Sequence, residues 1–103
     1  MHADIAEKRD ALGALCRRFG VARLEVFGSA ARGTDFDLQR SDVDFLVAFE
    51  PDVERPPLER FFGLAEALEV LLGRPVDLVE DGAVRNPYVR AGIDRSREQV
   101  YGS

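Results

Sequence analysis

The feature that most constrains this chain is a pair of aspartates at the start of an apolar segment, Asp42-Val43-Asp44 followed by Phe-Leu-Val-Ala-Phe. Aromatic and branched residues in this run predict a β-strand over residues 42–49. Because side chains two apart on a strand point to the same face, we expect Asp42 and Asp44 to project together, away from Val43. Two ionised carboxylates on an apolar strand repel each other and resist the loss of water. A divalent cation removes that cost, and oxygen ligands favour Mg²⁺ or Mn²⁺.

A second apolar segment predicts a strand over Val21–Phe27 that ends at Gly28-Ser29. Gly28 has no side chain, so a phosphate can approach the backbone closely. Ser29 offers a hydroxyl at the start of a short helical turn with free N–H groups, and these donors suit a phosphate. Arg32 in this turn is either a ligand of a triphosphate or a solvated cation, and the residues leave both interpretations open. A phosphate-binding turn one loop away from a metal-binding acid pair predicts chemistry on a nucleoside triphosphate.

These residues together resemble the signature of the DNA polymerase beta-type nucleotidyltransferases. The motifs GSAARG and SDVDFLV, together with the short chain, most resemble those of the minimal nucleotidyltransferases, the antitoxin partners of HEPN-domain toxins. The resemblance runs from about residue 21 to 79 and implies an α/β (α+β) fold, a small mixed central sheet flanked by helices, as in the polymerase beta palm. It also implies a third metal-ligating aspartate on the neighbouring strand, and Asp77 in the short segment Val76–Val79 stands where that residue should be. The alternative for Asp77 is a cap on a turn.

The resemblance further implies a reaction. Asp42, Asp44 and Asp77 would hold two Mg²⁺ ions, with Mn²⁺ as an alternative, while Gly28 and Ser29 would bind the β- and γ-phosphates of ATP. AMP would pass to a hydroxyl of a partner protein, a cognate HEPN toxin. Two other hypotheses for the function stay open: a module that neutralises its toxin by docking alone, and one subunit of a split small-molecule nucleotidyltransferase. Since so short a chain offers little surface for both nucleotide and acceptor, we expect a partner or a second copy to complete the cleft.

Helices account for most of the remaining apolar pattern. Helical spacing predicts one helix over Asp4–Phe19, with Cys16 as a small core residue, a second over residues 57–72, and a third over about 87–97. The apolar stripe that we expect to bury the second helix consists of Leu58, Phe61, Phe62, Ala65, Leu68, Leu71 and Leu72.

The length and composition of the chain exclude several classes of protein and of binding site. The chain has 103 residues, enough for a single domain over residues 1–103. A net charge of −5 argues against a nucleic-acid partner, and a single lysine, Lys8, excludes a P-loop. A single cysteine excludes an internal disulfide and a Cys-rich zinc site. No apolar run approaches membrane-spanning length, so we expect a cytoplasmic location and no membrane partner.

Overall fold

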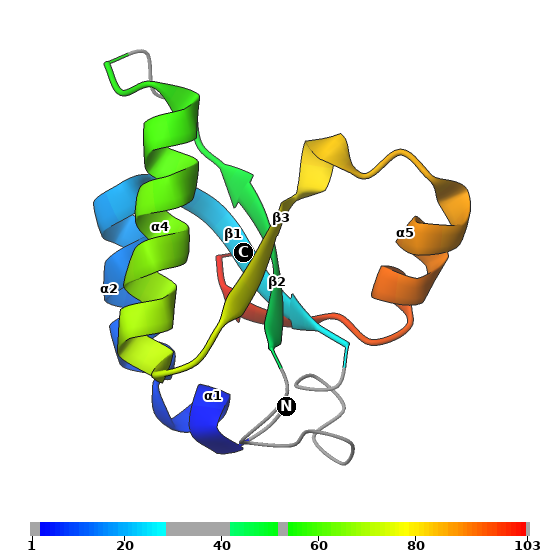
Figure 1. Cartoon of the computed structure of the whole chain (residues 1–103), viewed down its shortest axis with the longest axis horizontal. Helices are drawn as coiled ribbons and strands as arrows, with labels where there is room; N and C mark the ends of the chain where they lie inside the picture. Colours follow the sequence, from blue (N-terminus) through cyan, green and yellow to red (C-terminus); the bar gives the residue numbers. More distant parts are fainter. Residues whose placement is uncertain (1–2, 29–41, 52–53, 103) are drawn as a thin grey trace.

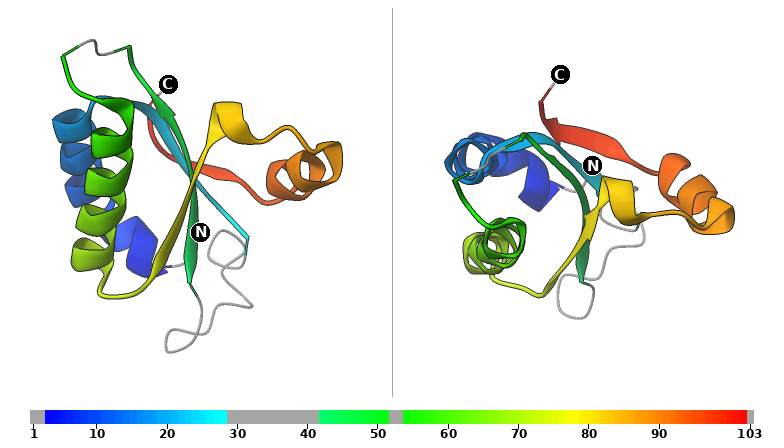
Figure 2. Two further views of the ribbon diagram at one scale, coloured as in Figure 1. Left: turned by 45° about the horizontal axis from the view of Figure 1, so that its top comes forward. Right: turned by 90° about the horizontal axis from the view of Figure 1, so that it is seen from above.

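The computed structural model describes residues 3–28, 42–51 and 54–102, and in it helices lie on both sides of one four-stranded sheet (Figures 1 and 2). The strands are β1 (Val21–Phe27), β2 (Val43–Phe49), β3 (Val76–Glu80) and β4 (Glu98–Tyr101). The helices are α1 (Ala3–Glu7), α2 (Arg9–Phe19), α4 (Pro57–Leu72) and α5 (Pro87–Asp94), with a 3-10 turn η1 (Asp81–Ala83). Helices α2 and α4 pack side by side on one face, and α5 lies on the opposite side of the sheet (Figure 2). The expected α/β fold with a flanked central sheet is confirmed.

The sheet has the strand order β3-β2-β1-β4 and mixes two kinds of pairing. Strand β1 is antiparallel to both β2 and β4, whereas β2 and β3 are parallel. A parallel pair needs a crossover connection, and α4 supplies it. Strand β4 was not expected from its short, polar sequence. It forms because its backbone pairs with the edge of β1, a contact that local sequence does not reveal.

The core lies between the sheet and the α2–α4 layer. From β2, alternate residues Val43, Phe45 and Val47 are fully buried there, as the period-two pattern predicts. Cys16 on α2 is also fully buried, as expected for a core residue. Burial raises the pKa of the Cys16 thiol to about 12, so the thiol stays protonated at neutral pH. In the described part of the chain, no helix combines the length and the apolar character that crossing a membrane requires.

The first predicted helix is interrupted in the structure. It splits at Lys8 into α1 and α2, and the break redirects α1 so that Ile5 packs into the core (Figure 1). Gly20 ends α2 in the left-handed conformation, with φ of 69°, and its N–H donates to the carbonyl of Arg17. The C-terminal helix likewise ends at Asp94, earlier than predicted, because the next residues turn to enter β4.

The apolar stripe of α4 is only partly buried. Leu68 and Leu72 face the core as predicted, but Leu58 is 70% exposed and Phe62 is 63% exposed, so the prediction is wrong for these two residues. At 3.6 residues per turn, Phe62 lies roughly 120° around the helix from Leu68, which turns it away from the sheet. Arg60 takes a buried position instead, with its guanidinium 4.9 Å above the Phe49 ring.

Candidate active site

The register of the parallel strands brings two of the predicted aspartates side by side. Asp44 on β2 pairs with Asp77 on β3, so both side chains lie on the sheet face opposite the α2–α4 layer. Asp44 is partly buried, whereas Asp77 is exposed. Asp42 immediately precedes β2 and is exposed. The chain therefore places all three predicted carboxylates at one end of two neighbouring strands.

The electrostatics of Asp44 show that these carboxylates act on one another. The pKa of Asp44 rises from 3.8 to about 6, first because the side chain is partly buried and then because Asp77 and Asp42 repel its negative charge. In this environment the ionised form of Asp44 is disfavoured unless a positive charge arrives. The sequence analysis predicted that repulsion and the loss of water would disfavour ionised carboxylates on this strand, and the raised pKa of Asp44 shows both effects.

Whether this set of side chains suits a metal depends on donors and on geometry. Carboxylate oxygens with unrelieved mutual repulsion fit a hard divalent cation such as Mg²⁺. Over residues 3–28, 42–51 and 54–102, no three His, Cys, Asp or Glu side chains are already gathered closely enough to hold an ion. The donor chemistry thus fits the ion, and Asp42, Asp44 and Asp77 are the residues that would hold it together with the phosphates of a nucleotide.

Gly28 directly follows the end of β1 and lies beside Asp44. Its φ is +72°, in the left-handed region that favours glycine, and a Cβ at this position would lie 2.7 Å from Oδ2 of Asp44. Any other residue would therefore meet both an unfavourable backbone conformation and the carboxylate. Gly28 is required here because its backbone lies against the Asp44 side chain.

The backbone N–H of Gly28 already has a hydrogen-bond acceptor in the structure. It donates a hydrogen bond of 2.9 Å to Oγ of Ser96, which lies between α5 and β4. Ser29 and Arg32, the other predicted phosphate ligands, lie outside the described residues, as does the helical turn expected from Ser29 to Arg32. Ser96 was missed because nothing in its local sequence distinguishes it from a loop serine.

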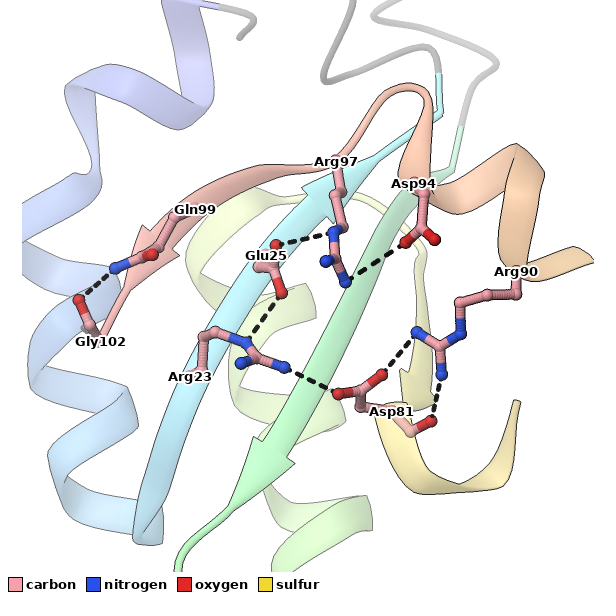
Figure 3. A network of polar contacts seen from close by, with 8 residues as sticks. All are labelled: Arg23, Glu25, Asp81, Arg90, Asp94, Arg97, Gln99 and Gly102. Carbon is pink, nitrogen blue, oxygen red and sulfur yellow. Dashed lines mark hydrogen bonds and ion pairs between the residues drawn. The ribbon is translucent and has the colours of Figure 1, made fainter. Parts of the chain in front are cut away.

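A network of ion pairs on the same sheet face was also missed (Figure 3). Its centre is Glu25, a buried residue on β1. Its carboxylate forms ion pairs with Nε of Arg23 at 2.8 Å and with Nε of Arg97 at 3.5 Å. Arg97 also lies 3.4 Å from Oδ1 of Asp94. A glutamate inside the otherwise apolar run Leu24–Phe27 was a usable signal, because a charge in such a strand needs partners.

The network continues toward β3 through a second carboxylate. Nη2 of Arg23 donates to Oδ2 of Asp81 at 2.7 Å, and Nη1 of Arg90 donates to Oδ1 of the same residue at 2.6 Å. Nη2 of Arg90 also donates to the Asp81 carbonyl at 2.7 Å. These contacts tie α5 and η1 to β1 (Figure 3).

Similar proteins extend what the geometry shows. Residues 8–100 match the family described as the nucleotidyltransferase domain. The protein adenylyltransferase MntA of Thermococcus cleftensis is 44% identical over 87 residues, which cover 84% of this chain and 80% of that protein. A solved structure assigned as a minimal nucleotidyltransferase is 38% identical, with a TM-score of 0.74 and coverage of 95% of both chains.

A third comparison, at lower identity, concerns the fold alone. An MNT antitoxin solved in complex with a tri-AMPylated HEPN toxin of Shewanella oneidensis is 18% identical, with a TM-score of 0.66, covering 96% of this chain and 73% of that one. The resemblance to the minimal nucleotidyltransferases is confirmed by these matches. With its matched residues spanning most of the sequence, this chain belongs to the nucleotidyltransferase family.

Proposed function

We propose that this nucleotidyltransferase moves AMP from ATP to a hydroxyl of a HEPN-domain partner protein and acts as the antitoxin of that partner. The observation that carries the proposal is the pairing of Asp44 with Asp77 directly beside the Gly28 turn. Two findings from similar proteins support the choice of reaction: a relative is named a protein adenylyltransferase, and a protein of the same fold was solved with an AMPylated HEPN toxin. We further propose that residues 1–103 act as one domain in the cytoplasm, where ATP is available.

The roles of the residues follow from their positions. Asp42 and Asp44 would hold Mg²⁺ or Mn²⁺, with two ions bound in all and Asp77 as the third ligand. The bound ions would neutralise the triphosphate and the carboxylates. Gly28 would let the β- and γ-phosphates approach the backbone, and Ser29 would donate its hydroxyl to them. Arg32 is proposed as a further phosphate ligand.

In the transfer itself, Asp77 takes the proton of the attacking hydroxyl. The hydroxyl oxygen forms a bond to the α-phosphorus, and the bond from that phosphorus to the bridging oxygen breaks, so pyrophosphate leaves with the electron pair. The chain's own contribution is to hold the reacting groups in line and to place carboxylates where charge must be balanced. The acceptor comes from outside, and the exposed side chain of Asp77 is accessible to it.

The direct test combines the protein with ATP, Mg²⁺ and a cognate HEPN-domain protein, to be sought first in the reading frames next to its own. Intact-mass measurement of the partner should show the addition of one or more AMP groups, and the partner should lose its toxic activity. A double variant, Asp42→Asn with Asp44→Asn, should leave the partner unmodified. If the partner is neutralised without any gain in mass, the protein acts by docking and the proposed transfer is refuted. If AMP is added to a small molecule instead of the partner, the chain serves a small-molecule nucleotidyltransferase.

A further inference from the structure

We infer that Ser96 is a positioning residue of this active site: its hydroxyl holds the Gly28 turn in the orientation that the triphosphate requires. The inference rests on the proposed function, because the role of Gly28 toward phosphate is part of that proposal. No sequence pattern points to Ser96, which follows Gly28 by 68 positions in the chain.

The contact is specific in its geometry. The N–H of Gly28 donates to Oγ of Ser96 at 2.9 Å, and both residues are partly buried. The N–H of Ser96 itself donates to the Ile93 carbonyl at 3.1 Å, which fixes the serine in the turn after α5. Since the loss of an acceptor from a partly buried N–H is costly, this hydroxyl determines the direction of the Gly28 peptide.

Gly28 needs such a constraint more than another residue would. Glycine has no side chain to restrict its backbone and populates positive and negative φ about equally. In this turn its φ is +72°, and the Cβ position points at Oδ2 of Asp44. Gly28 is therefore held between the Ser96 hydroxyl and a predicted metal ligand, and a rotation of its peptide would change the approach of the turn to Asp44.

The residues next to Ser96 contact β1, the strand that leads into Gly28. The next residue, Arg97, links Glu25 of β1 to Asp94 at the end of α5 (Figure 3). Glu98 then opens β4 opposite Val26. Ser96 is thus anchored to the same strand that carries Gly28, so a displacement of the serine is transmitted to the turn. This arrangement gives the ion-pair network a function beyond holding the C-terminal segment.

A role in structure alone makes a different prediction. If Ser96 only fastens α5 to the sheet, its loss should affect the protein as any loosening of α5 does. The matched control is Asn86→Ala, because the Asn86 side chain caps α5 by accepting from the N–H groups of Tyr88 and Val89 and has no contact with Gly28. Ser96→Thr serves as the rescue variant, since it retains the hydroxyl.

The experiment compares the full-length wild type, Ser96→Ala, Ser96→Thr and Asn86→Ala. Amide exchange at Gly28, followed by NMR without ligand, should be roughly tenfold faster in Ser96→Ala only, because the hydrogen bond that protects this amide is gone. Calorimetric titration with ATP and Mg²⁺ should show roughly five- to tenfold weaker binding in Ser96→Ala, the factor expected for one neutral hydrogen bond. Binding of AMP should change less than twofold. Ser96→Thr and Asn86→Ala should bind ATP as the wild type does.

Each other outcome overturns the inference. Unchanged or tighter ATP binding in Ser96→Ala, or an equal loss in Asn86→Ala, shows that Ser96 does not position the turn for phosphate. A Gly28 amide that exchanges equally in all four proteins refutes the contact itself. If the wild type fails to bind ATP, the proposed function falls and this inference with it. Should Ser96→Ala fail to fold, Ser96→Cys takes its place, because it keeps the shape of serine and weakens the acceptor.

Discussion

Replacement of Asp44 by Asn should make the metal-free protein more stable at alkaline pH, although Asp44 is a proposed metal ligand. The change keeps the shape of the side chain and removes a charge that the fold disfavours. At about 1.36 kcal/mol for each pH unit, the rise of the Asp44 pKa from 3.8 to about 6 corresponds to about 3 kcal/mol. Because Asp44 is only partly buried, solvent screens part of this cost, and we expect a gain of about 1–2 kcal/mol in the free energy of unfolding.

The direction of the pH dependence follows from the two pKa values. The folded protein binds the Asp44 proton more tightly than the unfolded chain does, so stability from this group is fully present below pH 4 and is lost as the pH rises through 6. Asp44→Asn should therefore exceed the wild type in stability at pH 8 and differ little from it at pH 4. Thermal unfolding in the presence of a chelator measures the difference, at about 4–8 °C in Tm for each kcal/mol.

Two comparisons make this test decisive. Asp77→Asn, on the neighbouring strand, should gain less, because it removes the repulsion from Asp77 but leaves the larger cost, the burial of the Asp44 carboxylate, in place. Added Mg²⁺ and ATP should stabilise the wild type by mass action and the Asp44→Asn variant far less, which reverses their order. A variant that is no more stable than the wild type at pH 8, or that gains equally at pH 4 and pH 8, would refute the claim that repulsion and burial act on Asp44.

Two further substitutions separate binding from catalysis. Asp77→Asn should keep much of the ATP affinity and lose AMP transfer, because a group at the attacking hydroxyl acts mainly in the transition state; calorimetry and intact mass measure the two, and transfer at the wild-type rate would make Asp77 structural. Ser29→Ala should weaken ATP binding by about 1–2 kcal/mol and leave AMP binding nearly unchanged, since only ATP carries the outer phosphates. Paired titrations of both nucleotides decide this point, and an equal loss for ATP and AMP would place Ser29 elsewhere.

The features predictable from the sequence are those that neighbouring residues determine. The alternation of Val43, Phe45 and Val47 identified β2 and its buried face, and the same alternation set Asp44 on the opposite face. The family resemblance singled out Asp77 in its short strand. That Asp44 and Asp77 lie side by side required the family resemblance, because strand register is a property of the assembled sheet.

The features that were missed depend on contacts between distant parts of the chain. Strand β4 exists because β1 offers it an edge, and Ser96 is significant because Gly28 lies against it. The exposure of Leu58 and Phe62 follows from the angle at which α4 meets the sheet, which the apolar stripe alone does not define. In each case the local pattern is compatible with the structure, but the pattern cannot choose among several arrangements.

The surroundings of Asp44 combine features that destabilise the fold with contacts that stabilise it. A carboxylate that is partly buried and repelled by two others weakens the empty fold, and Gly28 adds a backbone conformation that only glycine adopts without cost. The structure compensates nearby: the Ser96 hydroxyl holds the glycine, and the network centred on Glu25 fixes the segment that carries the serine. Among the described residues of this face, Glu25 and Asp81 are paired with arginines, whereas Asp44 is repelled by the neighbouring carboxylates of Asp77 and Asp42. A cation with its nucleotide would balance the negative charge there, so the position of the unrelieved charge is itself an argument for where the ligand binds.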